Sequence, residues 1–532
     1  MPKQYYMKFK LFLTDRSYLP VFVVALLLIV LLAIFTWNLS FRLDTDYNVV
    51  LPMAQFAINA FTNPQKFLIR NPYIGLGVPV LGDPSSLVFS PWYMPIFLLF
   101  GADIGLRAII ALTVIVSGWS MWVFLSSLGL DKRIVIWGSM LYETSGAFAA
   151  IVASGHIEKF ASYAVTPLAF FYIWKPKMRM VERISLGLLM TCMYLSDDFY
   201  TPWFLGIFFL SHALYKIKGI FMDLLVIYGT FFAFSLPKLI PFVRDVLPYF
   251  DRRSFINPYE GSIQALLLPL TYMVPWQVTF YDRPFFQRLL GFHYNWYEYY
   301  AFITPIAFIP LIKLRGVLHK IQVKWIFVAL LVGASYISLQ YPYSPFYWIF
   351  QAFPFMQTFR VPQRIVVPLL VPVIALLCYC ADYWIKEKKQ VQTLLRIILF
   401  SSVMWTFIVA MATMRSAFAP KRVVEKSVAQ ELRLRDTGNY YVANFVCCMQ
   451  PFLLDESIPI LNYYYGWTPS YAPRFTNTAG DQFDFSPFRL MRPSYIIAEK
   501  KETFIEFGYR QYFEKGNIQV WKSEEPTIFP TL

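Results

Sequence analysis

The run PVFVVALLLIVLLAIFTW, residues 20–37, decides the fold class of this chain. It carries no charged side chain, and its length suits a helix across the hydrocarbon core of a bilayer, which needs about 20 apolar residues. It is too long for the apolar core of a signal peptide, and no small-x-small cleavage site follows it. We therefore expect an uncleaved membrane helix near the N-terminus.

Similar apolar runs recur along the 532 residues, of which 57% are hydrophobic and 15% charged. Soluble proteins carry about 25% charged residues, so this composition excludes a water-soluble enzyme. We predict a polytopic α-helical membrane protein with about 11 transmembrane helices, in a range of about 10 to 13. The range reflects 263–275 and 345–360, which are short, Pro-rich and aromatic and fit re-entrant segments as well. The predicted spans are 20–38, 103–129, 134–153, 159–174, 181–196, 202–217, 219–241, 299–314, 325–341, 362–384 and 394–413.

The net charge of +15 lies on one face of this predicted topology. Alternate connections hold 20 Lys and Arg against 4 Asp and Glu. Basic connections stay in the cytoplasm, so we expect a cytoplasmic N-terminus and an external C-terminal region. The charge therefore reflects topology, and we expect no nucleic-acid partner. The basic segments are 1–19 and the connections around 131–133, 175–183, 216–218, 313–324 and 386–396.

All long polar segments are predicted outside the membrane. They are the first external loop 39–102, the external loop 242–298 and the C-terminal region 415–532. The pattern of the last region predicts a helix at 424–436 and strands at 439–445, 458–465, 493–499 and 517–522, with a short helix at 503–507. We therefore expect a membrane domain over 1–414 and an extracytoplasmic α/β domain over 415–532.

Two carboxylates follow the first predicted helix directly, in FRLDTDYN (41–48). In an extended segment, Asp44 and Asp46 lie on one side of the backbone, and a carboxylate at the membrane–water boundary can act as a general base. An ordinary acidic loop explains the pair equally well. Asp83, the one charge in the Gly- and Pro-rich stretch 71–101, fits a turn former better than a catalyst.

Several motifs in order along the chain resemble one protein family. The stretch NPYIGLGVPVLGDPSSLVFSP (71–91) is similar to that of the YfhO-type bacterial proteins of the GT-C superfamily of membrane glycosyltransferases. GHIEK (155–159), NWYEYYAFITP (295–305), FPFMQTFRVPQR (353–364) and YYYGW (463–467) match the same family. One departure is NPQKFLIR (63–70), where the family has a Gly, a Pro and a Trp before the NPY motif.

The resemblance implies a GT-C fold in the bacterial cytoplasmic (inner) membrane. It also implies transfer of a sugar from a polyprenyl-phosphate donor to an external acceptor, which could be a glycan, a lipid or a protein. Asp46 aligns with the acidic residue of the family's first loop, so we expect it to be the base, with Asp44 sharing or replacing that role. Glu298 also matches the family and is a candidate second acid.

The remaining candidates lie at predicted external turns. His156 and Lys159 of GHIEK, with Glu158 between them, could hold the donor phosphate, although a snorkelling lysine and a histidine satisfied in a turn explain them too. Asp197 and Asp198 could bind a metal, an acceptor or a cation, or simply cap the next helix. The sequence identifies no cofactor with certainty; if a metal is present, Asp46, Asp198 and His156 would suit Mg²⁺ or Mn²⁺.

Arg360 and Arg364 open the tenth predicted helix, four residues apart on one face. Because helix N-termini favour anions, we expect both to bind the donor phosphate rather than to act as interfacial anchors. A non-catalytic scaffold or subunit of a larger membrane complex is the alternative function. A transporter ranks third, since intramembrane charges are few and no inverted repeat is visible.

Overall fold

A computed structural model describes most of the chain. The described residues are 18–43, 45–63, 70–71, 78–79, 86–175, 177–216, 220–246, 302–337, 348, 362–387, 392–438, 442–444, 452–453, 456, 458, 460, 493–499, 504–505 and 508–524. They divide into two compact units. The first unit comprises Met1–Trp37, Arg107–Ser235 and Arg252–Ala417, and the second comprises Asn38–Leu106, Leu236–Asp251 and Phe418–Leu532.

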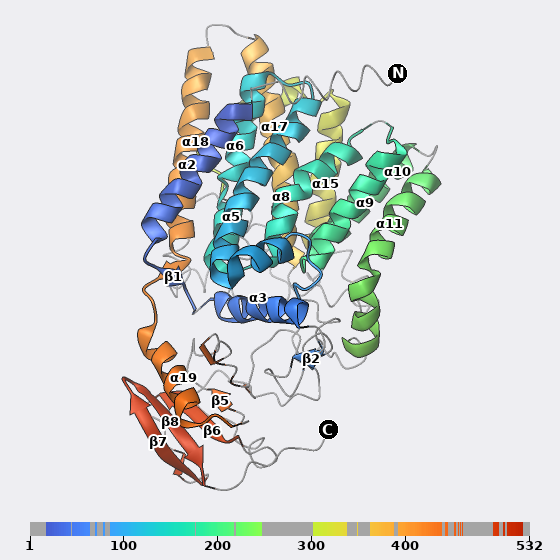
Figure 1. Cartoon of the computed structure of the whole chain (residues 1–532). Helices are drawn as coiled ribbons and strands as arrows, with labels where there is room; N and C mark the ends of the chain where they lie inside the picture. The colour runs from blue at the N-terminus through green and yellow to red at the C-terminus, as the bar shows by residue number, and fades with distance from the viewer. Residues whose placement is uncertain are drawn as a thin grey trace. The chain divides into compact units, whose positions relative to one another are not determined.

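The first unit is a bundle of helices that run roughly alongside one another (Figure 1). Its interior is formed by apolar side chains such as Phe124, Phe170 and Leu377, all fully buried. The helices are α2 (Leu19–Thr36), α5 (Met94–Ser127, shared with the second unit), α6 (Lys132–Glu143), α7 (Gly146–Ser154), α8 (Glu158–Ile173), α9 (Met180–Leu195), α10 (Tyr200–Lys216), α11 (Ile220–Pro241, shared at its end), η6 (Pro305–Gly316), α15 (Ile321–Ile337), η9 (Pro362–Ile365), α17 (Val366–Glu387) and α18 (Gln392–Arg415).

A described helix occurs at each of the eleven predicted spans, and the chain is a multi-pass membrane protein. Within the described residues, six helices are long and apolar enough to cross a bilayer, and the count of about eleven stays a prediction. The span predicted at 299–314 differs in kind, because η6 is a 3₁₀ helix of 12 residues with Pro310 inside it. Proline lacks the amide that an α-helical hydrogen bond requires.

The third predicted span is broken between α6 and α7, and two tyrosines hold the break. The rings of Tyr142 and Tyr163 stack with centroids 4.5 Å apart. The Tyr142 hydroxyl donates to the Tyr163 carbonyl at 2.8 Å, and the Tyr163 hydroxyl donates in return to the Tyr142 carbonyl. The amide of Gly146, the first residue of α7, donates to the Phe302 carbonyl at 2.8 Å. Backbone groups freed by the break are thus satisfied inside the protein, as a low-dielectric surrounding requires.

The second unit begins with a short antiparallel pair. Strand β1 (Ser40–Phe41) pairs with β4 (Phe418–Ala419), so the residues after the first membrane helix lie beside those after α18. Helix α3 (Tyr47–Thr62) follows β1, and β2 (Arg70–Asn71) pairs with β3 (Val78–Pro79). The π-helical turn η2 (Phe242–Val246) continues α11.

The C-terminal part of the second unit contains a four-stranded sheet in the order β5-β6-β8-β7. The strands are β5 (Val442–Asn444), β6 (Tyr495–Glu499), β7 (Tyr509–Lys515) and β8 (Ile518–Ser523). Helix α19 (Val423–Arg435) lies against the sheet (Figure 1), and its Val428 and Leu432 share a buried core with Tyr495 and Val520.

The helix predicted at 424–436 and the strands predicted at 439–445, 493–499 and 517–522 correspond to α19, β5, β6 and β8. At 458–465 the described residues show one bridge, from Ile460 to Val442. Of the helix predicted at 503–507, only residues 504 and 505 are described. A separate domain over 415–532 and its external location stay predictions.

Candidate functional site

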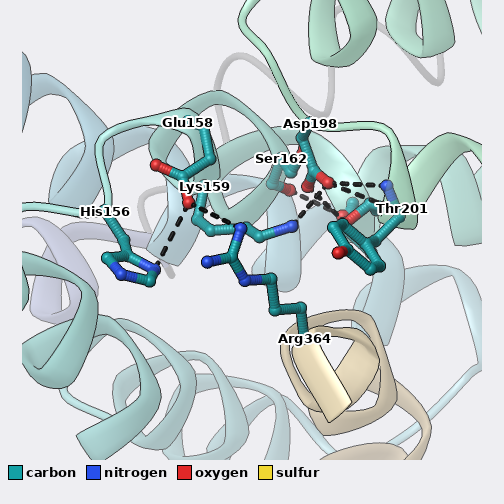
Figure 2. Close-up of polar contacts among 9 residues, drawn as sticks. His156, Glu158, Lys159, Ser162, Asp198, Thr201 and Arg364 are labelled. Carbon is teal, nitrogen blue, oxygen red and sulfur yellow. Dashed lines mark hydrogen bonds and ion pairs between the residues drawn. The ribbon is translucent and has the colours of Figure 1, made fainter. Parts of the chain in front are cut away.

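Three helices of the first unit begin at one place, where the charged residues of two predicted motifs meet (Figure 2). Helix α8 begins at Glu158, α10 begins at Tyr200, and η9 begins at Pro362 and continues into α17. The amide ends of helices favour negative charge, because their first N–H groups have no partner within the helix. The arrangement therefore surrounds this position with partial positive charge.

The GHIEK motif forms the turn that leads into α8. Gly155 ends α7 with φ +84°, a left-handed conformation that glycine adopts without steric cost. The amides of Gly155 and His156 both bond to the Ile151 carbonyl, at 3.2 and 3.1 Å. This tight ending places His156, Glu158 and Lys159 together at the start of the next helix.

Lys159 and Asp198 form a buried ion pair at the base of the cluster. The Lys159 Nζ lies 2.6 Å from the Asp198 Oδ1, and the two side chains are only 2% and 0% exposed. Taking two charges out of water costs several kcal/mol for each ion, so such a pair persists only with close contact and further hydrogen bonds. The structure provides both.

Asp198 also holds the first turn of α10. Its Oδ1 accepts from the amides of Tyr200 at 3.0 Å and Thr201 at 3.2 Å, and its Oδ2 accepts from the Thr201 hydroxyl at 2.6 Å. Burial raises the pKa of Asp198, but the charge of Lys159 and the hydrogen bonds from Lys159 and Thr201 outweigh it, so the pKa lies below its usual value. Asp198 is therefore a charged helix cap bound to a lysine.

A second, more exposed layer lies beside this pair. The Glu158 Oε1 is 3.3 Å from His156 Nδ1 and 3.4 Å from Arg364 Nη1. Arg364 reaches across from the start of α17 (Figure 2), and its side chain is 22% exposed. The Tyr200 ring contacts both layers, with Lys159 Nζ 4.6 Å and Arg364 Cζ 5.6 Å from its centroid.

The cluster has the chemistry of an anion site with a fixed base. Arg364 presents nitrogen donors in the more exposed layer, the buried His156 lies beside it across Glu158, and three helix N-termini add to their field. Lys159 is held beneath them by Asp198. The structure thus gives Lys159 a supporting position rather than the accessible one expected of a direct phosphate ligand.

Asp46 belongs to the second unit and is described there by itself. It is the residue before α3, and its carbonyl accepts from the amides of Val49 and Val50, each at 2.9 Å. Tyr47, the next residue, is fully buried, while Asp46 itself is exposed. The carboxylate is therefore attached to a firmly packed helix start.

Apart from Asp46, the predicted site residues fall into three groups. His156, Glu158, Lys159, Asp198 and Arg364 are brought together in the first unit. Asp197 adjoins them, with a left-handed φ of +73°. Asp44, Asp83, Glu298 and Arg360 lie outside the described residues. Among the side chains that are described, no three His, Cys, Asp or Glu residues are close enough to hold a metal ion.

Two buried or partly buried side chains, Tyr200 and Lys238, were not predicted from the sequence. Tyr200 was not singled out, although its ring joins Lys159 to Arg364. Lys238, within a predicted span, is 1% exposed and donates to the Ser86 carbonyl at 3.2 Å. A lysine inside an apolar run is itself a signal, since intramembrane charge needs a partner.

No protein-family model and no curated protein matches the chain. Solved structures do match it. ArnT from Cupriavidus metallidurans bound to undecaprenyl phosphate is similar at 12% identity and a TM-score of 0.54, over 96% of this chain and 98% of ArnT. Its apo structure gives a TM-score of 0.51 at 12% identity, over 93% and 97%.

Arabinofuranosyltransferase AftD from Mycobacteria is similar at 12% identity with a TM-score of 0.60, over 96% of this chain and 40% of AftD. ArnT and AftD are GT-C glycosyltransferases. At this level of identity, the likeness establishes the fold alone. The chain has the fold of the GT-C membrane glycosyltransferases, as its motifs led us to expect.

Proposed function

We propose that this protein is a YfhO-type GT-C glycosyltransferase of the bacterial inner membrane. It moves a sugar from a polyprenyl-phosphate donor to an extracytoplasmic glycan, lipid or protein. The observation that carries the proposal is the two-layered cluster at the starts of α8, α10 and α17, in a fold shared with ArnT, whose structure holds undecaprenyl phosphate. The N-terminus is cytoplasmic, and the C-terminal region faces the acceptor.

The donor phosphate binds to Arg364, together with Arg360 four residues earlier and His156. Arginine suits this role because its planar guanidinium bonds two phosphate oxygens at once. Glu158 holds Arg364 and His156 until the phosphate arrives. Lys159 supports these residues indirectly. It pairs with Asp198 and contacts the Tyr200 ring, which in turn contacts Arg364.

Asp46 acts as the general base, with Asp44 as the neighbour that shares or replaces this role. The acceptor oxygen forms a bond to the anomeric carbon while the bond from that carbon to the phosphate oxygen breaks. Polyprenyl phosphate leaves with the electron pair, and the proton of the acceptor hydroxyl passes to the carboxylate. Glu298 is the candidate second acid. Mg²⁺ or Mn²⁺ dependence is tested with EDTA and metal restoration.

Binding of undecaprenyl phosphate tests the phosphate site directly. Purified protein in nanodiscs is titrated with undecaprenyl phosphate and, separately, with undecaprenol, which lacks the phosphate. We expect preferential binding of the phosphate. We expect Arg364→Ala to weaken that binding about tenfold or more, since a hydrogen bond between charged groups contributes about 1.5–3 kcal/mol and 1.4 kcal/mol is a factor of ten.

Arg396→Ala is the matched control, because Arg396 is exposed at the start of α18 on the predicted cytoplasmic side. Equal effects of the two variants, or equal binding of the alcohol and the phosphate, would overturn the site. Transfer itself is measured with radiolabelled undecaprenyl-phosphate sugars and envelope fractions as acceptors. A removed general base costs about 10²–10⁴ in rate, so Asp46→Asn should nearly abolish transfer. Transfer by Asp46→Asn at the unmodified rate would overturn Asp46 as the base, whereas absence of transfer by the unmodified protein would favour the non-catalytic scaffold.

A further inference from the structure

We propose that three aromatic side chains, Phe41, Tyr47 and Phe418, form a clamp that positions Asp46, and that Phe418 sets the rate of transfer through it. The inference rests on the role of Asp46 as the base. It assigns a function to a residue far from Asp46 in sequence, next to the last membrane helix.

The clamp is a continuous stack within the second unit. The ring centroids of Phe418 and Phe41 are 4.8 Å apart, and those of Phe41 and Tyr47 are 4.4 Å apart. Exposure falls along the stack, from 5% at Phe418 to 1% at Phe41 and 0% at Tyr47. Close-packed rings of this kind have few alternative positions, because protein interiors leave little free volume.

The backbone also holds two of the three residues together. In the β1–β4 pair, Phe41 lies opposite Phe418 and Ser40 lies opposite Ala419. A two-residue strand pair is marginal alone, so the stacked rings and the pair depend on each other. Removing the Phe418 ring should therefore loosen both.

Asp46 is linked to the clamp by one peptide bond. Tyr47 is the first residue of α3, and the amides of Val49 and Val50 bond to the Asp46 carbonyl. A side chain on this helix start moves whenever Tyr47 moves. A misplacement of about 1 Å can cost about 10²-fold in rate, since the base must meet the acceptor hydroxyl in a narrow geometry.

A purely structural role for Phe418 would show itself differently. It would lower the amount of folded protein and the melting temperature, while folded molecules would turn over normally. A positioning role lowers kcat of the folded protein and leaves binding of undecaprenyl phosphate unchanged. The two roles are therefore separable by kinetics.

The test compares Phe418→Ala with Phe504→Ala. Phe504 is equally buried in the second unit, at 1% exposed, but it packs on Trp521 beneath the sheet rather than on α3. We expect Phe418→Ala to lower kcat at least tenfold with an unchanged Kd for undecaprenyl phosphate, and Phe504→Ala to keep kcat within twofold. Phe418→Tyr, which keeps the ring, should retain most of the activity. Equal losses of kcat in the two alanine variants would overturn the clamp.

A disulfide between β1 and β4 should hold the two strands together even when the Phe418 ring is removed. Cysteines at positions 40 and 419 face each other in an antiparallel pair, with a Cα separation of about 4.5–5.5 Å that suits a disulfide. In Ser40→Cys/Ala419→Cys/Phe418→Ala, oxidation should recover most of the lost kcat, and reduction should lose it again. Recovery of the melting temperature without kcat would contradict positioning.

Amide hydrogen exchange measures how firmly the start of α3 is held, and it needs no sugar donor. Phe418→Ala should speed exchange at the amides of residues 48–50, and Phe504→Ala should not. Unchanged exchange overturns the clamp alone. Failure of the base assignment looks different, because Asp46→Asn would then transfer sugar at the normal rate whatever Phe418 does.

Discussion

Lys159 and Asp198 form an ion pair whose side chains are 2% and 0% exposed. Removing one of them leaves the charge of the other buried without a partner, which lowers the free energy of unfolding. We expect Lys159→Met to destabilise the protein by about 3–5 kcal/mol, because it leaves a buried carboxylate uncompensated. The double variant Lys159→Met/Asp198→Leu should lose less than the two single variants together. Thermal unfolding in nanodiscs gives the three values.

The control for this cycle is Lys313→Met. Lys313 pairs with Glu387, but these side chains are 24% and 36% exposed. Water screens such a pair, so its loss should change stability by about 1 kcal/mol or less. A similar loss in Lys313→Met and Lys159→Met would mean that burial does not govern the Lys159–Asp198 pair.

Acid should weaken the same pair. The folded-state pKa of Asp198 lies below its usual value, whereas an Asp side chain in the unfolded chain has a pKa of about 3.9. A lowered folded pKa gives stability that is present above the unfolded pKa and disappears as pH falls through the folded one. The difference in melting temperature between the unmodified protein and Asp198→Asn should therefore be constant from about pH 7 to 5 and shrink below about pH 4. A difference that grows toward acid would show the opposite shift.

Single residues of the site were predictable, but their partners were not. Charged side chains are rare in this chain, which is why the sequence pointed to His156, Glu158, Lys159, Asp198 and Arg364. That Lys159 pairs with Asp198, 39 residues away, depends on how α8 packs near the start of α10. The expected choice between capping and site chemistry for Asp198 was also incomplete, since it caps α10 and binds Lys159 at once.

At the scale of elements, α5 and α6 approach closely at Gly118. A Cβ there would clash with Glu143 Oε2 and lie 2.8 Å from Val21 Cγ1 of α2. Overpacking of this kind costs about 1–3 kcal/mol, so we expect Gly118→Ala to lower the melting temperature. Gly229→Ala in α11 is the matched control, since a Cβ there meets nothing within 4 Å. A loss in Gly229→Ala equal to that in Gly118→Ala would refute the packing argument.

Helices were easier to predict than strands. Apolar runs gave the position of most described helices of the bundle to within a few residues, because a bilayer imposes length and apolarity on the helices that cross it. Strand β7 was missed, since a bulge between Gln511 and Phe513 breaks the alternation of buried and exposed side chains that identifies a strand. The break between α6 and α7 was missed as well, because Tyr142 and Tyr163 satisfy it across 21 residues.

We expect the basic connections and the C-terminal region to lie on opposite sides of the membrane. Lys426 in α19 and Lys177 between α8 and α9 are both exposed. We expect a membrane-impermeant maleimide to label Lys426→Cys in intact spheroplasts, and Lys177→Cys only after permeabilisation. The reverse pattern would invert the topology. Unmodified protein corrects for the native cysteines.

The GT-C fold itself was recognisable from short motifs in order along the chain. The β1–β4 pair was not, because two-residue strands leave no periodic pattern in a sequence. Membrane topology follows from local composition, whereas the assembly of the second unit depends on contacts between distant segments. The sequence pattern therefore predicted the bundle but not the β1–β4 pair that precedes α3.

The pairing of Ser40 with Ala419 joins residues 379 positions apart. A ribosome adding about 5–20 residues per second needs roughly 20 to 80 s to cover that distance. Throughout that time, the aromatic face of Phe41 and Tyr47 has left the ribosome before its strand partner has been made. Unpaired strand edges and apolar surface are what chaperones bind and what aggregates contain. Pairing of β1 with β4 is consequently a late event in the biosynthesis of this protein, because it needs residues that follow α18.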